Sequence, residues 1–211
     1  MEEKIVLKKV VQKGGRYELT VSTLDEPLVV DAEIVHRYRL VPDIVLTPSQ
    51  LEQLRAEGEL LACDNALSRV LAIREHSVRE AELKLQRKGF GPDAVRAVVQ
   101  KYRKLELLDD ARYARRVVEA SLKRNPSGRG FLIALLRKKG IARTLAERTV
   151  DATLRNVDEV ELATRSLEKR WSGYSQLELE RARRKAYNYL SRRGISYQAA
   201  KAAFDKLYNQ E

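Results

Sequence analysis

The spacing of apolar and polar residues changes along the chain near residue 45. Residues 4–11 and 16–23 are rich in apolar and β-branched side chains, and they flank a Lys-Gly-Gly segment. Glycine readily takes the positive φ angles of a tight hairpin turn. We therefore expect two antiparallel strands that turn at Gly14 and Gly15.

The next segment predicts short elements of mixed type. Residues 28–30 are expected to add a third strand, and Asp31 to cap a short helix. Thr47, followed by a proline and then a glutamine, has the spacing of a capping box. We expect a helix there that ends at Gly58.

From residue 65 the apolar positions follow a helical period, and one helix-ending signature occurs three times. A leucine is followed four residues later by a glycine, which has a basic doublet before it and an apolar residue after it. The three copies are Leu85 with Gly89 and Phe90, Leu136 with Gly140 and Ile141, and Leu190 with Gly194 and Ile195. Glycine at a helix end accepts the left-handed conformation at little cost. Three copies in register indicate internal duplication.

Capping signals divide each copy into helices. Ser77, Thr144 and Ser175 each precede a glutamate by three residues, as in a capping box, and Asp109 and Asp110 also suit a helix start. The expected helices lie near residues 65–75, 78–88, 92–107, 110–124, 129–139, 144–156, 158–172, 177–193 and 197–209.

These elements predict a mainly α fold. Three tandem three-helix repeats, at 65–109, 110–157 and 158–211, are expected to form an elongated, curved array. A small α+β module at 1–64, which contains the β-hairpin, precedes them.

The amino-acid composition supports a helical chain and excludes several classes of protein. Hydrophobic residues make up 44% and aromatic residues 6%. The single cysteine, Cys63, excludes an intrachain disulfide and a cysteine-cluster metal site. No apolar run approaches the roughly 20 residues of a membrane helix, and the acidic start lacks the pattern of a signal peptide. We expect a soluble, cytoplasmic protein.

The net charge of +11 is unevenly distributed. Residues 1–64 have a balance of −4, whereas residues 65–211 have a balance of +15. The later part is therefore expected to bind an anionic partner: nucleic acid, an acidic protein surface or an anionic membrane.

Candidate catalytic residues do not form a recognisable constellation. His36 and His76 have no second ligand at metal-binding spacing, so surface or capping roles are expected. Cys63 and Trp171 are expected to pack in cores. The sequence predicts a protein that is not an enzyme and holds no metal or cofactor.

The repeat signatures resemble the RecX family of recombinase regulators. The residues that carry the resemblance are Leu71, Arg74, Ser77, Glu80, Leu85 and Lys88-Gly89-Phe90 in the first repeat; Leu107-Leu108-Asp109-Asp110 and Tyr113-Ala114 at the following junction; Gly128, Ile133, Leu136, Lys138, Lys139, Gly140 and Ile141 in the second; and Leu190, Arg193, Gly194 and Ile195 in the third. The amino-terminal module resembles an extension that some family members carry.

The resemblance implies a modulator of the RecA recombinase. Family members bind in the groove of the RecA filament on single-stranded DNA, have no catalysis of their own, and usually inhibit filament growth, ATPase, recombination and SOS activities. It further implies a partner that is this filament rather than a membrane. We expect a monomer when the protein is free.

Basic residues on the middle helix of each repeat are the predicted contacts, because they fall outside the apolar stripes. They are Lys84, Lys88, Arg129, Arg137, Lys138, Lys139, Arg181, Arg184, Lys185 and Arg192. The alternative is a protein that binds single-stranded nucleic acid directly through the same basic face.

Overall fold

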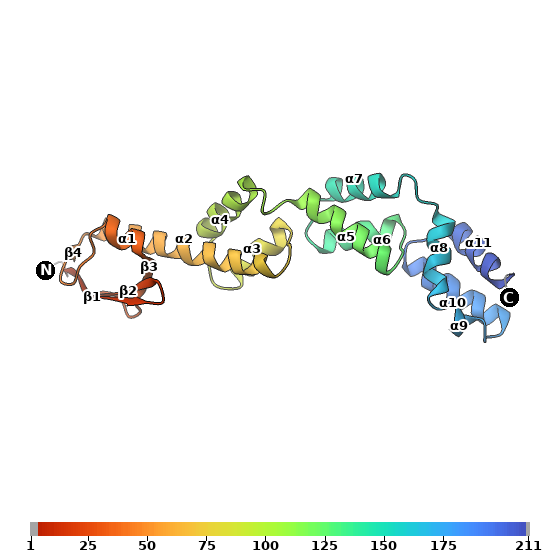
Figure 1. Cartoon of the computed structure of the whole chain (residues 1–211), viewed down its shortest axis with the longest axis horizontal. Helices are drawn as coiled ribbons and strands as arrows, with labels where there is room; N and C mark the ends of the chain where they lie inside the picture. The colour runs from red at the N-terminus through yellow and green to blue at the C-terminus, as the bar shows by residue number, and fades with distance from the viewer. Residues whose placement is uncertain (1–3, 210–211) are drawn as a thin grey trace. The chain divides into compact units, whose positions relative to one another are not determined.

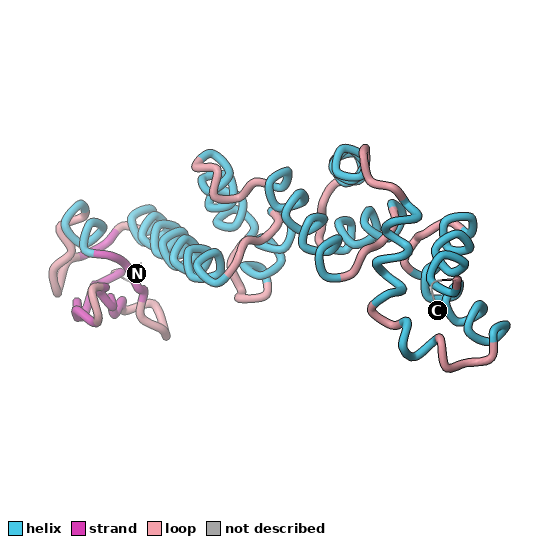
Figure 2. The backbone as a smooth tube through the Cα atoms, turned by 45° about the vertical axis from the view of Figure 1, so that its right-hand side comes forward, coloured by secondary structure: helices cyan, strands magenta, loops and turns pink. Residues whose placement is uncertain are grey.

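The computed structural model describes residues 4–209, which fold as two compact units (Figure 1). One unit contains the residues up to His76 together with Ala81–Leu108. The other contains Ser77–Glu80 together with the residues from Asp109 onward. The described residues are mostly helical, and strands occur only near the amino terminus (Figure 2). The predicted fold class, mainly α with a small α+β module before it, is confirmed, while the curvature of the array stays a prediction.

The amino-terminal sheet has four antiparallel strands in the order β3-β2-β1-β4. Their bounds are Ile5–Lys13 for β1, Arg16–Val21 for β2, Leu28–Asp31 for β3 and Val45–Leu46 for β4. Gly14 and Gly15 form the β1–β2 turn with φ values of +55° and +83°, which confirms the predicted hairpin. The two-residue strand β4 was not predicted, because a pair of residues carries no period.

The sheet packs against helices α1 (Ala32–Arg37) and α2 (Pro48–Ile73). Leu19 and Val30 of the sheet share a core with Leu51 and Leu54 of α2. The Asp31 carboxylate accepts a 3.0 Å hydrogen bond from the Ile34 backbone N–H, so the predicted cap of α1 is confirmed. The sheet and the start of α2 therefore form one hydrophobic core.

Helix α2 is longer than predicted. Its capping box at Thr47 is confirmed, but the helix does not end at Gly58, and no separate helix begins at residue 65. Gly58 is buried, and a Cβ atom there would lie 2.9 Å from the Val29 carbonyl oxygen. This glycine allows the helix to approach β3 closely instead of ending it. The predicted boundary between residues 64 and 65 falls inside α2.

The remaining helices follow the predicted order, with one short addition. They are α3 (Val78–Gln86), α4 (Pro92–Lys104), α5 (Asp110–Arg124), α6 (Arg129–Lys138), α7 (Arg143–Leu154), α8 (Glu159–Glu168), α9 (Trp171–Tyr174), α10 (Leu179–Arg192) and α11 (Tyr197–Tyr208). Helix α9 is a single extra turn. Trp171 packs edge-on against Phe204 with ring centroids 5.5 Å apart, which confirms its packing role.

Two of the predicted caps are wrong. Helix α7 begins at Arg143, before Thr144, and no side chain caps it. Helix α10 begins after Glu178, whose carboxylate accepts hydrogen bonds from the backbone N–H groups of Glu180 and Arg181, both 3.1 Å long. Glu178 is the glutamate that the prediction had assigned to a box starting at Ser175. The predicted cap at Asp109 is confirmed.

The three repeated glycines occupy equivalent helix ends, as predicted. Gly89, Gly140 and Gly194 have φ values of +88°, +82° and +68°. In each copy the residue after the glycine donates its backbone N–H to the carbonyl of the repeated leucine. The three bonds are Phe90 to Leu85 at 3.4 Å, Ile141 to Leu136 at 3.1 Å and Ile195 to Leu190 at 3.1 Å. This is the Schellman motif, which satisfies the last carbonyls of a helix.

Successive repeats meet through the same junction twice. The Ser77 hydroxyl, just before α3, donates a 2.5 Å hydrogen bond to the Lys139 carbonyl at the end of α6. The Gly128 backbone N–H, just before α6, donates a 2.8 Å hydrogen bond to the Arg193 carbonyl at the end of α10. In both cases the acceptor directly precedes the repeated glycine. The ends of α6 and α10 are thus held against the starts of α3 and α6.

Candidate partner-binding surface

Helix α10 separates an apolar face from a basic face, as its sequence predicts. Ala182, Ala186 and Leu190 are buried in the core of the third repeat. The four predicted contact residues of this helix, Arg181, Arg184, Lys185 and Arg192, are all exposed. Among the described residues, none of the four lies within ion-pair distance of a carboxylate. Their positive charge is therefore available to a partner.

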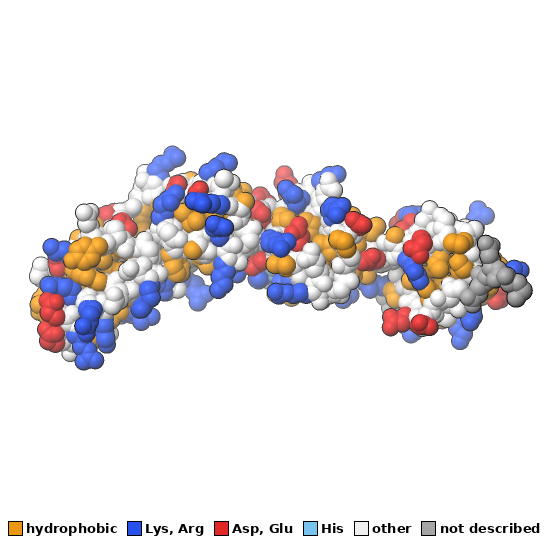
Figure 3. Space-filling view, turned by 180° about the vertical axis from the view of Figure 1, so that it is seen from behind, with side chains coloured by type: hydrophobic (Ala, Val, Ile, Leu, Met, Phe, Trp, Pro, Cys, Tyr) orange, Lys and Arg blue, Asp and Glu red, His pale blue; other side chains and the backbone are white. Residues whose placement is uncertain are grey.

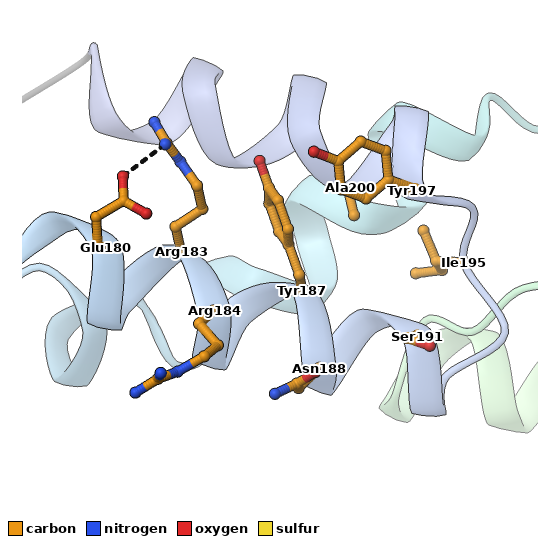
Figure 4. A pocket seen from close by; sticks show the side chains of 9 residues that line it. All are labelled: Glu180, Arg183, Arg184, Tyr187, Asn188, Ser191, Ile195, Tyr197 and Ala200. Atoms are coloured by element: carbon orange, nitrogen blue, oxygen red, sulfur yellow. Dashed lines mark hydrogen bonds and ion pairs between the residues drawn. The ribbon is translucent and has the colours of Figure 1, made fainter.

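A groove between α10 and α11, which we call the α10–α11 groove, adjoins these cations (Figure 4). Its volume is about 460 Å³. Tyr187 points from α10 toward α11, and its ring meets that of Tyr197 edge-on with centroids 5.2 Å apart. Tyr197 is 67% exposed, whereas Tyr187 is half-buried. The groove thus offers an open aromatic ring, and Arg184 and Asn188 also line it.

Charge at the start of α10 is arranged by short-range contacts. The two backbone N–H groups that bond to the Glu178 carboxylate hold its pKa below the usual value, and Arg184 adds to this effect. Arg183 pairs with Glu180 at 2.8 Å, so this arginine is neutralised within the groove. The other cation of the lining, Arg184, has no carboxylate within ion-pair distance among the described residues.

Two of the predicted contact residues of the second repeat form ion pairs within the protein, and two do not. Arg129 forms an ion pair with Asp151 at 2.6 Å, and Lys139 one with Glu80 at 3.3 Å. Arg137 and Lys138 are exposed and have no carboxylate within ion-pair distance in the described residues. On the first repeat, Lys84 and Lys88 are exposed as well, again without a carboxylate partner among residues 4–209. Figure 3 shows Lys and Arg side chains spread over one face of the molecule, with fewer Asp and Glu side chains among them.

The histidines and the cysteine do not assemble a site. His36 is exposed, as predicted, but His76 is only 4% exposed, and its Nδ1 lies 2.9 Å from the Arg74 carbonyl oxygen. Of the surface or capping roles expected for His76, the surface role is therefore wrong, because the turn before α3 is packed inside. Cys63 is buried as expected, and burial raises the pKa of its thiol to about 11. Within residues 4–209, no three potential metal-binding side chains come together.

Some residues of this surface were not found from the sequence. Tyr197 and Asn188 belong to different helices, and only the folded third repeat brings them to one groove. A tyrosine directly after the Ser196 cap gave no sequence signal of its own. No helix in the described part of the chain has the length and apolar character to cross a membrane.

Tandem three-helix repeats with a basic exposed helix define a helical-repeat protein. The family model described as "RecX, third three-helix domain" matches residues 157–204. Regulatory protein RecX of Pelodictyon phaeoclathratiforme is 32% identical over 135 residues, which cover 64% of this chain and 82% of that protein. Regulatory protein RecX of Trichlorobacter lovleyi is 30% identical over 146 residues, which cover 68% of this chain and 94% of that protein. The chain belongs to the RecX family and is a regulatory protein of this type.

Solved structures share the fold over most of the chain. A crystal structure of regulatory protein RecX matches with a TM-score of 0.68 at 20% identity, and covers 95% of this chain and 99% of that one. The crystal structure of RecX from Lactobacillus salivarius matches with a TM-score of 0.60 at 22% identity. The match covers 72% of this chain and 98% of that one. The first of these likenesses extends over nearly the whole chain and therefore takes in strands as well as helical repeats.

Proposed function

We propose that this protein binds the RecA filament on single-stranded DNA, in its groove, and inhibits filament growth and ATP hydrolysis, and with them recombination and SOS activity. The observation that carries the proposal is the exposed basic face of α10, whose four cations have no carboxylate partner in the described residues. A nucleoprotein filament is a polyanion, and complementary charge favours association with it. Membership of the RecX family supports the same partner.

Binding alone is sufficient for such regulation. A chain with several basic helices has more than one contact to offer, and linked contacts raise avidity without any chemistry. A protein bound in the groove blocks the addition of the next recombinase protomer or bridges two neighbours. The proposed activity therefore needs neither a cofactor nor a catalytic group, and the proposed protein acts as a cytoplasmic monomer.

The test is ATP hydrolysis by a RecA recombinase on single-stranded DNA while this protein is titrated. The wild-type chain is expected to lower the rate. We then change Arg181, Arg184, Lys185 and Arg192 together to Glu. This variant is expected to inhibit much more weakly, because each new carboxylate is repelled by the negatively charged filament. These residues lie outside the apolar stripe, and exposed changes usually cost within about 0.5 kcal/mol of stability each.

A matched control has the same change in net charge elsewhere. Arg148, Arg165, Lys201 and Lys206 are exposed residues of α7, α8 and α11. Reversal of these four to Glu is expected to leave most of the inhibition. Equal inhibition by both quadruple variants, each shown by circular dichroism to be folded, would contradict a role for the α10 face.

A second candidate function is direct binding of single-stranded nucleic acid. The exposed Tyr197 ring in the α10–α11 groove favours it, since stacking of a base on an aromatic side chain contributes about 1–3 kcal/mol. Binding of an oligothymidine without recombinase is then expected to weaken for Tyr197→Ala and to persist for Tyr197→Phe. Identical affinities for the two variants would remove this candidate.

A further inference from the structure

A second groove lies in the amino-terminal unit, where three elements distant in sequence meet. It is lined by Arg16 of β2, Asn65 and Arg69 of α2, Lys88 and Phe90 of the turn after α3, and two alanines of α2. Its volume is about 330 Å³, within the range of small-ligand sites. We call it the amino-terminal basic groove.

The groove is open because of the residues that α2 presents to it. Ala62, Asn65, Ala66 and Arg69 follow the spacing of three and four that places residues on one helix face. The two alanines leave the space that larger side chains would fill. Asn65 holds its own position through a 2.9 Å hydrogen bond from its Nδ2 to the Leu61 carbonyl oxygen.

All the charged residues of this groove are positive. Arg16, Arg69 and Lys88 have no carboxylate within ion-pair distance among residues 4–209, and no acidic residue lines the groove. Three other grooves of the chain each contain a carboxylate beside their cations. These carboxylates are Glu180 in the α10–α11 groove, Glu119 and Asp151 in the groove of α5 and α7, and Asp64 in the groove of α2 and α4.

A lining whose charged residues are all cations attracts an anion. Like charges gathered at one site repel one another, and an anion between them replaces that repulsion with attraction. Two guanidinium groups and one ammonium group suit phosphate oxygens in particular. Phe90 is half-buried and adds an apolar surface beside the cations.

We propose that the amino-terminal basic groove binds the phosphodiester backbone of a nucleic-acid strand. The acidic amino-terminal part of the chain thereby contributes Arg16 to a nucleic-acid contact. This inference goes beyond the proposed function, because it assigns a ligand to residues outside α10 and does not depend on a recombinase.

The first experiment measures binding of a fluorescent 20-mer oligothymidine to the full chain, without recombinase, at several salt concentrations. The variant with Arg16, Arg69 and Lys88 changed to Gln is expected to bind about ten-fold more weakly at low salt, since each exposed contact contributes a few-fold. The slope of log affinity against log salt is expected to fall by about 2, because each phosphate contact with a single strand contributes about 0.7.

The matched control removes the same charge from the same unit. Lys8, Lys9 and Arg103 are exposed and lie outside the groove. Their change to Gln is expected to leave the salt slope close to that of the wild-type chain. Equal slopes for the two triple variants would overturn the proposal, as would a wild-type chain that does not bind the oligonucleotide. Neither result would contradict filament inhibition through α10.

A second experiment uses the unmodified protein, so a folding defect cannot imitate its result. Lysine acylation is followed residue by residue by mass spectrometry, with and without the oligonucleotide. Lys88 is expected to be protected, whereas Lys8 and Lys9 are expected to react as before. Unchanged acylation of Lys88 would overturn the proposal. Equal protection by ATP at the same phosphate concentration would also overturn it, because a free nucleotide would then be the ligand.

Discussion

Gly128 lies so close to Gly194 that a Cβ atom on Gly128 would stand 2.0 Å from the Gly194 carbonyl oxygen. The two glycines belong to successive repeats, and the Gly128 N–H bonds to the Arg193 carbonyl beside them. Gly128 has a φ of −78°, which any residue adopts, so its role is close approach rather than an unusual backbone conformation. Arg193 adds a cationic contact over the Phe131 ring, 5.4 Å from its centroid. The junction between these repeats therefore depends on a missing side chain.

Gly128→Ala is expected to lower the free energy of unfolding by about 1–3 kcal/mol, the usual cost of overpacking. Gly130→Ala is the matched control, because no atom lies within 4 Å of a Cβ atom there. As Gly130 is inside α6, alanine is expected to stabilise the chain by up to about 1 kcal/mol. Urea unfolding of both variants is the measurement. A Gly128 variant as stable as the Gly130 variant would contradict the close junction.

The repeated glycines are expected to differ in their tolerance of alanine. Gly89 and Gly140 both have a positive φ, which costs a side chain about 1–2 kcal/mol. A Cβ atom on Gly89 meets nothing within 4 Å, whereas one on Gly140 would lie 2.5 Å from the Arg79 Cβ atom. Gly140→Ala is therefore expected to destabilise the chain more than Gly89→Ala in thermal unfolding. Equal losses would mean that backbone conformation alone matters.

Asp109 is expected to make stability depend on acid pH. Its carboxylate accepts hydrogen bonds from the N–H groups of Arg112 and Ala111, which hold its pKa below the ordinary value of 3.8. A lowered folded-state pKa gives stability that is present above the unfolded-state pKa and lost as the pH falls through the folded-state value. Asp109→Ala is expected to cost about 1 kcal/mol at pH 7, as for other helix caps.

The variant Asp109→Asn distinguishes the effect of the helix cap from the effect of the negative charge. Asparagine caps a helix about as well as aspartate, so stability at pH 7 is expected to change little. The loss of stability between about pH 5 and pH 2 is expected to be smaller than in the wild-type chain. Urea unfolding at several pH values measures both effects, and parallel profiles for the two proteins would contradict the assignment.

Cys63 is expected to be unreactive in the folded protein. The thiol is fully buried and its pKa is raised to about 11, so at pH 8 only about one molecule in a thousand carries a thiolate. Reaction with a thiol reagent such as DTNB is expected to become fast only in denaturant. Rapid labelling of the folded chain would show that α2 opens along its buried face.

Local signals in the sequence were sufficient for much of the fold. The leucine, glycine and apolar residue of each Schellman motif lie within six residues, so Gly89, Gly140 and Gly194 were predicted as equivalent helix ends. Position 58 is also a glycine, but for another reason: its neighbour is Val29, in a strand almost thirty residues earlier. A short stretch of sequence does not distinguish a glycine that ends a helix from one that admits a neighbouring strand.

The candidate surfaces were predicted only in part, for the same reason. The exposure of Arg181 and Arg184 follows from the apolar stripe of α10 itself. The pairing of Arg129 with Asp151 required the packing of α6 against α7. Arg16 and Lys88 line one groove only because the sheet packs on α2. Residues that depend on tertiary contacts are therefore those that the sequence did not reveal.

The junction between repeats has a direction. The second and third repeats each present the glycine end of their middle helix to the start of the middle helix in the repeat before. Two unlike surfaces of this kind do not close on each other, so one more copy of the unit finds a partner on both sides. Gly89 has open space where Gly140 and Gly194 have a neighbour, which marks the beginning of the series. A further repeat added to this series would therefore use the contacts that already join the existing repeats.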